Sequence, residues 1–355
     1  MTDIRTITVE PLGVDVPCRA DQTILDACLR HGVNVPHACT HGTCGTCKVE
    51  VLDGEVELGD ASTFALLESE RNEGKALICT ATPSSDVTIE ADIEQEEGVT
   101  FHAVRDFVGT VVEIDECAAD IRRLRIDLDK DIVFNAGQYV QVSIPGGAGG
   151  VTRSWSMANP PEQPRQIELQ IRRLVGGLGT DGWVFKDLAV GDTVNLSGPY
   201  GRFFFRDLRP EPAILIGGGT GLAPLKAMAR HILETGAEQS LVLYHGARTR
   251  ADIYDVDYFR QMESRYPERF SYRPALSDED AEGFGHGLIT EVLEGDFETC
   301  RGHVAYLCGP PPMVEAALKS LMRRRLFPRD IYREDFFDTS DKATGGIRSP
   351  LIRTA

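Results

Sequence analysis

The order of apolar and polar positions predicts short elements over the first hundred residues. Residues 6–13 and 14–20 alternate apolar and polar side chains, as two paired strands do. Residues 23–32 place apolar side chains at helical spacing, and Thr23 is positioned to cap the first turn. A cysteine-containing loop and an expected strand at 48–57 follow.

The acidic stretch 91–98 is predicted to be a linker, so the first domain is expected to span residues 1–97. A second pattern begins after it. Residues 101–207 contain short strand-like runs separated by turn residues, and little of this segment looks helical. Such a pattern predicts a small antiparallel β-barrel. The expected strands are 107–115, 121–128, 138–145, 166–175 and 192–199.

From residue 208, buried strands alternate with helices. An apolar strand at 212–219 precedes an amphipathic helix at 222–236, and the alternation continues to residue 337. Strand–helix alternation indicates a parallel sheet with crossover helices, so residues 208–337 are predicted to form an α/β domain. Residues 338–355 are left as a C-terminal tail.

The composition limits the classes of partner that this chain is expected to bind. The chain has 355 residues and a net charge of −18, which disfavours nucleic acid and anionic membranes because both repel a polyanion. No apolar run approaches the roughly 18 residues of a membrane helix, and the N-terminus lacks an export signal, so we expect a cytoplasmic protein. Residues 1–97 carry 19 acidic and 6 basic side chains. This excess indicates either simple solubility or a docking face for a basic partner.

Four of the nine cysteines form a recognisable pattern. Cys39, Cys44 and Cys47 have the spacing C-x4-C-x2-C, and Cys79 follows at a distance, as in plant-type [2Fe–2S] proteins. A zinc site is the alternative, but it usually pairs two short cysteine knuckles and this chain lacks the second. The sequence therefore predicts one [2Fe–2S] cluster. The isolated Cys18, Cys28, Cys117 and Cys300 are expected to pack in cores.

A glycine-rich turn connects a strand to a helix in the third segment. Residues 217–224 read Gly-Gly-Gly-Thr-Gly-Leu-Ala-Pro. Glycines allow close backbone approach and a helix N-terminus favours an anion, so the turn is typical of a phosphate site. It is not the G-x-G-x-x-G fingerprint, because residue 222 is leucine.

Three further motifs complete the pattern. Residues 153–156 read Arg-Ser-Trp-Ser, residues 177–180 read Gly-Leu-Gly-Thr, and residues 308–313 read Cys-Gly-Pro-Pro-Pro-Met. Together with the cysteines and the glycine-rich turn, they resemble the reductase components of bacterial multicomponent oxygenases over essentially the whole chain. The resemblance implies a β-grasp ferredoxin domain, a FAD-binding barrel and an NAD-binding domain of the ferredoxin–NADP⁺ reductase superfamily.

The resemblance also implies residue roles. Arg153 would pair with the FAD pyrophosphate, while Ser156, near flavin N5, and Cys308, near nicotinamide C4, would be the catalytic residues. Trp155 replaces the usual tyrosine and can still stack on the flavin, without the hydroxyl contact. The other expected FAD ligands are Ser154, Gly177, Leu178 and Thr180, and the other expected NAD ligands are Gly218, Gly219, Thr220, Gly221, Gly309 and Pro310.

Other candidates are weaker. Gln138 and Tyr139 are more consistent with structural roles, whereas Phe336, Phe337 and Glu334 are candidates beside the flavin and the nicotinamide. For the nucleotide, Arg248 and Arg250 are suited to a 2′-phosphate, but Asp252 and Asp255 argue against one. We therefore expect NADH rather than NADPH.

The resemblance implies that electrons pass from NADH through FAD and the [2Fe–2S] cluster to the hydroxylase component of a diiron monooxygenase. The C-G-P-P-P-M motif, residues 64–71 (Phe-Ala-Leu-Leu-Glu-Ser-Glu-Arg) and the C-terminal Ile-Arg-Ser-Pro-Leu favour that group. The alternative is the reductase of a Rieske ring-hydroxylating dioxygenase. A stand-alone carrier with a vestigial flavin domain is disfavoured, because all the flavin and nucleotide motifs are intact.

Overall fold

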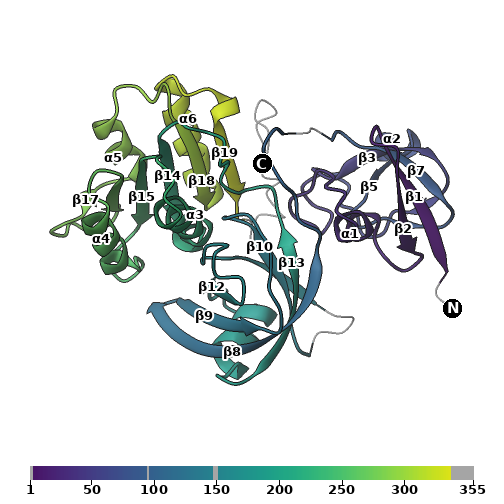
Figure 1. Cartoon of the computed structure of the whole chain (residues 1–355), viewed down its shortest axis with the longest axis horizontal. Coiled ribbons are helices and arrows are strands. Elements are labelled where there is room, and N and C mark those ends of the chain that lie inside the picture. The colour runs from purple at the N-terminus through teal and green to yellow at the C-terminus, as the bar shows by residue number, and fades with distance from the viewer. Residues whose placement is uncertain (1–2, 94–95, 147–150, 337–355) are drawn as a thin grey trace. The chain divides into compact units, whose positions relative to one another are not determined.

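The computed structural model describes residues 3–93, 96–146 and 151–336 (Figure 1). These residues divide into two compact units, with the boundary after Arg105. No helix in the described ranges is both long and apolar enough to cross a membrane. The predicted tail at 338–355 lies outside the described residues.

The first unit is a five-stranded mixed sheet with the order β2-β1-β7-β3-β5. The predicted hairpin is confirmed, because β1 and β2 pair antiparallel. The predicted helix is also confirmed, and the Thr23 hydroxyl accepts a hydrogen bond from the Asp26 amide, 3.3 Å away. The elements are β1 (Ile4–Glu10), β2 (Val14–Arg19), α1 (Ile24–Arg30), β3 (Lys48–Asp53), β4 (Val56–Glu57), α2 (Glu68–Asn72), β5 (Lys75–Leu77), β6 (Thr82–Pro83) and β7 (Val87–Glu90).

The expected single strand at 48–57 is wrong, because the chain turns at Gly54. Its φ of +89° belongs to the left-handed region, and a Cβ there would meet the backbone of Asp86 and Val87. The second half of the run, β4, consequently leaves the main sheet and pairs with β6.

The second unit begins with the predicted antiparallel barrel. Its six strands have the order β11-β10-β13-β8-β9-β12, and a bridge between Met157 and Leu169 joins the two ends of the sheet. Little of this segment was expected to be helical, and its one long helical element in the described residues is η1, a π-helix that follows β12. The elements are β8 (Arg105–Ala118), β9 (Ile121–Leu128), β10 (Tyr139–Ser143), β11 (Thr152–Ser156), β12 (Gln166–Arg172), η1 (Leu178–Asp187) and β13 (Thr193–Tyr200).

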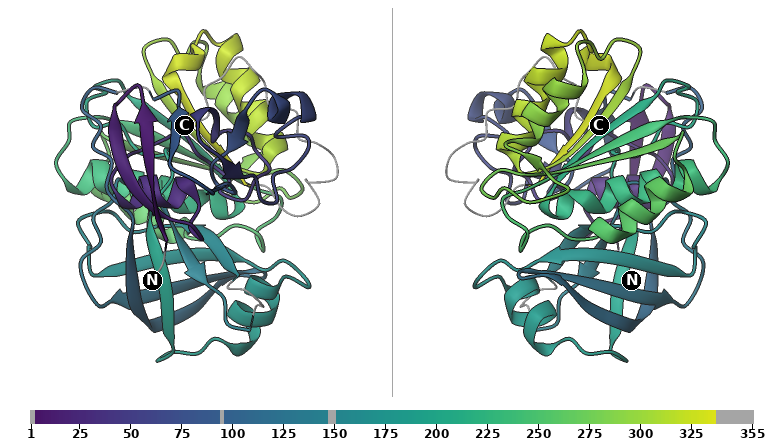
Figure 2. Two further views of the ribbon diagram at one scale, coloured as in Figure 1. Left: turned by 90° about the vertical axis from the view of Figure 1, so that its right-hand side faces the viewer. Right: turned by 90° about the vertical axis from the view of Figure 1, so that its left-hand side faces the viewer.

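The rest of the second unit is the predicted parallel sheet, with the order β17-β16-β15-β14-β18-β19. Helices cover both faces: α3 and α4 pack on one, and α5 and α6 on the other (Figure 2). The elements are β14 (Ala213–Gly218), η2 (Gly219–Gly221), α3 (Leu222–Glu234), β15 (Leu241–Ala247), α4 (Val256–Arg265), β16 (Phe270–Leu276), β17 (Gly285–His286), α5 (Ile289–Asp296), β18 (Val304–Gly309), α6 (Pro311–Arg323), η3 (Pro328–Asp330) and β19 (Ile331–Asp335).

One hydrophobic cluster is shared by the barrel and the parallel sheet. Phe203 and Phe205, which follow the last barrel strand, are buried with Leu225 of α3 and Tyr306 of β18. The Phe203 and Tyr306 rings meet edge to face with centroids 6.1 Å apart. Because the two sheets bury the same side chains, they form one packed unit and not two loosely tethered domains.

Candidate functional site

The four predicted cluster cysteines lie together in two pairs. Cys39, Cys44 and Cys47 belong to the loop between α1 and β3, and Cys79 follows β5. The Cys44 thiol hydrogen-bonds to Cys39 and lowers the pKa of Cys39, and the Cys79 thiol does the same for Cys47. The Cys39 amide also donates to Cys44 Sγ at 3.5 Å.

Two pairs of thiols fit two irons with two thiolates each. No three His, Cys, Asp or Glu side chains of the described residues converge as the ligands of one metal ion would. Gly42 explains how the loop reaches Cys79. It has a φ of +80°, and a Cβ there would lie 2.8 Å from the Thr80 methyl group. The donor set and the close backbone approach therefore suit a [2Fe–2S] cluster.

The other cysteines behave as predicted core residues. Cys18, Cys28 and Cys300 are buried, and Cys117 is partly buried against the core of the second unit. Burial raises the pKa of Cys18 and of Cys300 to about 11, so these thiols stay protonated at neutral pH.

The Arg-Ser-Trp-Ser motif forms β11 at one end of the barrel sheet. Arg153 pairs in register with Val142, and Ser156 pairs with Tyr139. The Arg153 side chain is exposed and donates to the carbonyl of Thr152 at 2.8 Å. Among the described residues it has no carboxylate partner, so its positive charge is available to an anion.

The Gly-Leu-Gly-Thr motif lies beside Arg153, although the two are far apart in sequence. A Cβ on Gly179 would lie 2.9 Å from Arg153 Cγ, so only glycine allows this approach. The motif forms the first turn of η1, where backbone N–H groups lack intrahelical acceptors. A guanidinium and N–H groups without intrahelical acceptors at one place suit the pyrophosphate of FAD.

Other contacts in this region are internal. The Thr180 hydroxyl accepts from the Leu174 amide at 3.0 Å and can donate to the Leu174 carbonyl, so it closes the turn. Trp155 stacks on Trp183 of η1, with ring centroids 6.5 Å apart. Gln138 donates to the Gly201 carbonyl, which supports the structural role expected for it.

The two nucleotide motifs meet at the carboxyl edge of the parallel sheet. Gly217 of β14 pairs in register with Cys308 of β18. A Cβ on Gly221 would overlap the Cys308 carbonyl, and one on Gly309, whose φ is +147°, would lie 2.8 Å from the Gly218 carbonyl. Helices α3 and α6 start at this edge, so two helix N-termini face the position where a dinucleotide phosphate would bind.

Cys308 and Glu334 are neighbours on adjacent strands. Cys308 is completely buried, and burial, then the carboxylates of Glu334 and Asp335, raise its pKa well above the ordinary value. Burial also raises the pKa of Glu334 to about 8. Part of Glu334 reaches the surface, but its Oε2 is buried and has no hydrogen-bond partner in the described part of the chain. The Phe336 amide donates to the Gly309 carbonyl at 3.0 Å, whereas Phe337 lies outside the described residues.

The two aspartates considered for nucleotide selectivity have different environments. Asp252 accepts from Arg248 and from the Thr249 hydroxyl at the end of β15, near the surface. Asp255 is instead buried in an ion-pair network with Lys226 and Arg123, so only Asp252 remains beside the loop.

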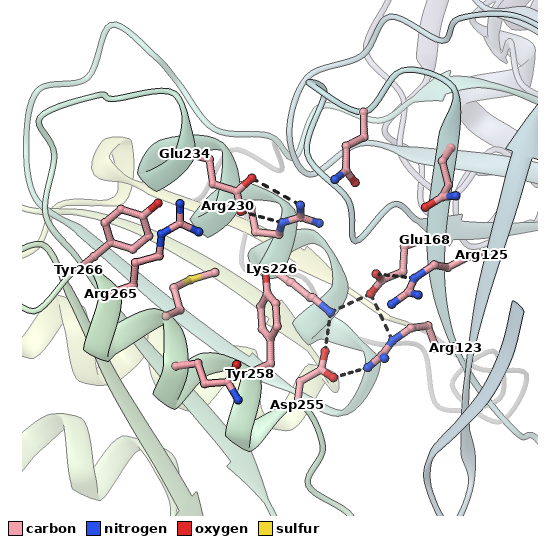
Figure 3. A pocket seen from close by; sticks show the side chains of 14 residues that line it. Arg123, Arg125, Glu168, Lys226, Arg230, Glu234, Asp255, Tyr258, Arg265 and Tyr266 are labelled. Carbon is pink, nitrogen blue, oxygen red and sulfur yellow. Dashed lines mark hydrogen bonds and ion pairs between the residues drawn. The ribbon is translucent and has the colours of Figure 1, made fainter.

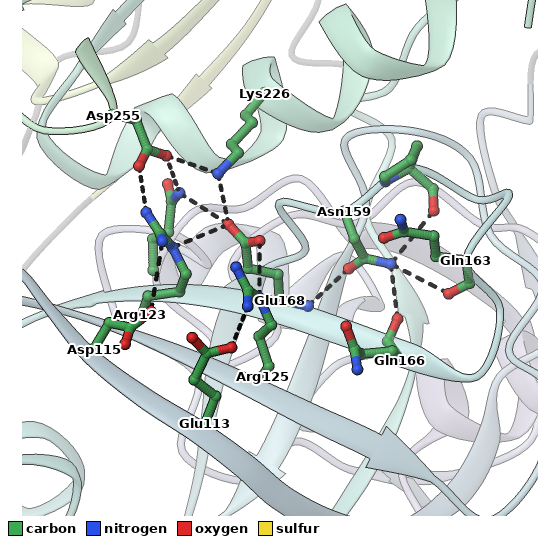
Figure 4. A network of polar contacts seen from close by, with 12 residues as sticks. Glu113, Asp115, Arg123, Arg125, Asn159, Gln163, Gln166, Glu168, Lys226 and Asp255 are labelled. Atoms are coloured by element: carbon green, nitrogen blue, oxygen red, sulfur yellow. Dashed lines mark hydrogen bonds and ion pairs between the residues drawn. The ribbon is translucent and has the colours of Figure 1, made fainter. Parts of the chain in front are cut away.

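That network borders a cavity of about 500 Å³ between β9 and β12 of the barrel and α3 and α4 (Figures 3 and 4). Nothing in the sequence distinguishes Lys226 or Glu168, because charged residues in amphipathic elements are normally solvated. The lining includes Arg123, Glu168, Lys226, Arg230, Asp255 and Tyr258.

Family models match each part of the chain. Residues 7–84 match the 2Fe-2S iron-sulfur cluster binding domain, residues 109–205 the oxidoreductase FAD-binding domain, and residues 215–319 the oxidoreductase NAD-binding domain. The predicted cofactor set of [2Fe–2S], FAD and a nicotinamide nucleotide is therefore confirmed, as is the predicted three-part fold.

Similar proteins match over nearly the full length. The reductase component of phenol 2-monooxygenase from Pseudomonas sp. strain CF600 is 44% identical over 98% of this chain and 98% of its own length. The reductase subunit of an aromatic O-demethylase from Amycolatopsis sp. strain ATCC 39116 is 42% identical over 94% of this chain and 100% of its own length. The crystal structure of the Amycolatopsis cytochrome P450 reductase GcoB superposes with a TM-score of 0.86 at 41% identity, covering 94% of this chain and 98% of that one.

Proposed function

Because this chain belongs to the family of iron–sulfur flavoprotein reductase components of multicomponent oxygenases, we propose that it carries electrons from NADH through FAD and a [2Fe–2S] cluster to a diiron hydroxylase. The observation that carries the proposal is the pairing of distant motifs. Arg153 lies against Gly179, and the turn at Gly221 lies against Cys308. Each pairing assembles one phosphate-binding place from two sequence segments.

The residues that would hold each group follow from this geometry. Arg153 and the first turn of η1 would bind the FAD pyrophosphate, and the turns at 218–221 and 308–310 would bind the nucleotide. The pairs Cys39–Cys44 and Cys47–Cys79 would each hold one iron. When bound, these cofactors supply the redox chemistry, a two-electron step from NADH and one-electron steps at the cluster.

The chain's own contribution near the nicotinamide is a protected, uncharged surface. Cys308 is fully buried as a neutral thiol, and Ser156 retains about 8% exposure. A neutral thiol neither attacks the nicotinamide ring nor attracts water to it, so its role is to position the ring. We assign Ser156 and Cys308 as the residues beside the reacting atoms.

NADH is the proposed donor, with Asp252 as the supporting residue, because a carboxylate at the end of the second strand suits a ribose hydroxyl and repels a 2′-phosphate. The test compares kcat/KM for NADH and NADPH in the purified protein. Preference for NADPH would overturn this part of the proposal.

The diiron partner is supported by the phenol monooxygenase relative and by the sequence of residues 64–71. A haem oxygenase is the competing partner, because the similar solved structure is named a cytochrome P450 reductase. Reconstitution with a diiron hydroxylase, a Rieske oxygenase and a cytochrome P450 separates these possibilities. Turnover with only one of the latter two would contradict the proposal.

The electron-transfer proposal itself is tested by the visible spectrum. NADH should bleach the flavin absorption of the purified protein and then the iron–sulfur absorption, in the absence of any partner. A flavin band that NADH fails to bleach would eliminate the proposal.

We further propose three functional domains, at 1–97, 101–207 and 208–337, within the two compact units. A cytoplasmic location belongs to the same proposal. Supply of NADH and cysteines kept free for a cluster both require a reducing compartment.

A further inference from the structure

Buried charged side chains meet where the barrel packs against the nucleotide-binding sheet. Lys226 of α3 lies 2.8 Å from Glu168 Oε1 of β12 and 2.7 Å from Asp255 Oδ2, just before α4 (Figure 4). The side chains of Lys226, Glu168 and Asp255 are only 4%, 7% and 5% exposed. Arg123 of β9 pairs with Asp255, and Gln170 Nε2 donates to Asp255 Oδ2 at 3.1 Å.

The pairs cross between the two layers. A cation of the nucleotide-binding sheet, Lys226, pairs with a barrel carboxylate, Glu168, and a barrel cation, Arg123, pairs with Asp255 of the other layer. Removing such charges from water is unfavourable unless partners are close and well placed. Sliding the layers apart would stretch both crossed pairs at once, so the network favours one relative position.

The network continues to the nucleotide turn along one face of β12. Glu168, Gln170 and Arg172 alternate along the strand and point to the same side. The Tyr254 hydroxyl lies 2.9 Å from Gln170 Oε1 and 3.1 Å from the carbonyl of Gly219. Arg172 also lies against Gly219, because a Cβ there would be 3.2 Å from the guanidinium. A displacement at Glu168 is therefore transmitted to the turn that is proposed to hold the nucleotide.

The backbone supports a fixed position for Asp255. Its φ of 57° and ψ of 18° belong to the left-handed region, which non-glycine residues seldom adopt. Such a conformation persists only where its surroundings hold it in place. Here the surroundings are the two cations and the amide of Gln170.

We propose that Lys226, Glu168, Asp255 and Arg123 form an interlayer latch that sets the position of the nicotinamide relative to the flavin. The inference rests on the proposed function and names positioning residues, none of which contacts the reacting atoms. In the step concerned, the C4–H bond of NADH would break and its hydrogen would pass to FAD with both bonding electrons, as a hydride. The products would be NAD⁺ and, after FAD takes up one proton from solvent, FADH₂. Such transfer requires reacting atoms about 3–3.5 Å apart, so a shift of about 1 Å can cost roughly 100-fold in rate.

The test compares Lys226→Met with Arg230→Met in the FAD- and cluster-loaded protein. Arg230 lies one turn further along α3 and borders the same cavity, but its carboxylate partner is Glu234 of its own helix, at 3.1 Å. Both variants remove one positive charge from the same helix. They differ in whether that charge bridges the two layers.

The first readout is hydrogen–deuterium exchange without NADH. We expect faster exchange in residues 166–172 and 252–258 of Lys226→Met, and no change there in Arg230→Met.

The second readout is rapid-mixing flavin reduction by saturating NADH. We expect the limiting rate to fall about tenfold or more in Lys226→Met, with the NADH dissociation constant within about twofold of the parent. After chemical reduction of the flavin, electron transfer to the cluster should be unchanged.

The outcomes distinguish the latch from the proposed function. A parent protein that NADH does not reduce would remove the proposed function. A parent that is reduced, with Lys226→Met matching Arg230→Met in both readouts, would overturn the latch alone. Lower thermal stability with an unchanged limiting rate would likewise overturn it. If Lys226→Met does not fold, Glu168→Gln, which keeps the side-chain shape, is compared in the same two readouts with Glu234→Gln, which removes the same charge from the partner of Arg230.

Discussion

Gly221 lies against the backbone of Cys308, so closely that a Cβ would overlap the Cys308 carbonyl and lie 2.6 Å from the Cα of Gly309. The glycine-rich turn and the Cys-Gly-Pro motif are therefore two halves of one surface. Neither half can move without displacing the other.

Gly221→Ala should consequently disrupt nucleotide use while leaving the flavin and the cluster bound. We expect kcat/KM for NADH to fall at least about tenfold, because the added methyl group must separate the two turns. Steady-state reduction of ferricyanide measures this. Gly295→Ala is the control, since a Cβ there meets nothing within 4 Å. Equal activity of the two variants would show that the turns are not one site.

Arg153 is expected to carry much of the FAD affinity. Arg153→Met removes the cation beside the first turn of η1, and a charged hydrogen bond contributes about 1.5–3 kcal/mol. FAD should therefore bind roughly 10- to 100-fold more weakly, as fluorescence titration of the apoprotein would measure. Arg165→Met removes an exposed barrel arginine, 3.5 Å from Asp131, and should leave FAD affinity unchanged. Similar losses in both variants would exclude a specific pyrophosphate contact.

The strands and helices that the sequence predicted share one property, a clear apolar period. The apolar run expected as a strand at 212–219 is β14, which is buried throughout, and β9 has the bounds that the pattern indicated. The helix η1 was not predicted, because Gly177 and Gly179 favour a turn. In the structure, the packing of Trp183 into the barrel core outweighs this local preference of the glycines.

The interlayer network could not be predicted for a different reason. Alternation in β12 is typical of a strand with one solvated face, yet Glu168 and Gln170 are only 6% and 3% exposed. The second layer covers that face, and its contributions, Lys226 and Asp255, come from distant segments of the sequence. These charged side chains become a buried group only through tertiary packing, which the local sequence pattern does not reveal.

Loss of the cluster should not affect the flavin reaction. Cys79→Ser removes one thiolate from the first unit. The proposed flavin and nucleotide sites lie within residues 106–336, which form a separate compact unit. We expect loss of the iron–sulfur absorption and of electron delivery to the partner, with NADH-dependent ferricyanide reduction retained. The buried Cys28, changed to alanine, should keep the cluster. Loss of ferricyanide reduction in Cys79→Ser would contradict this separation.

Glu334 should make the second unit less stable as pH rises. Its pKa is about 8 in the folded protein and near 4.5 in the unfolded chain. Between these values the folded state holds a proton that the unfolded chain releases, so stability falls with increasing pH. Glu334→Gln mimics the protonated form, and its melting temperature should exceed that of the parent increasingly from pH 5 to pH 8.5, by about a few degrees. Flavin fluorescence follows this melting. The exposed Glu298→Gln should show no such trend, and a constant difference for Glu334→Gln would refute the assignment.

The acidic first unit should guide partner docking. Residues 1–97 carry a net charge of −13, and opposite charge on a partner raises association rates at low salt. Electron transfer to the hydroxylase should therefore slow as salt rises, whereas single-turnover flavin reduction by NADH should change less.

Charge variants near the cysteine loop test the same idea. Asp60 is exposed, and its carbonyl lies 3.1 Å from the Cβ position of Gly42 in that loop. Asp60→Asn combined with Glu68→Gln should weaken the salt dependence and lower the rate with the partner. Asp280→Asn with Glu282→Gln makes the same charge change on the second unit and should not. Coupling that is independent of salt, or equal effects of the two double variants, would show that the acidic surface serves solubility alone.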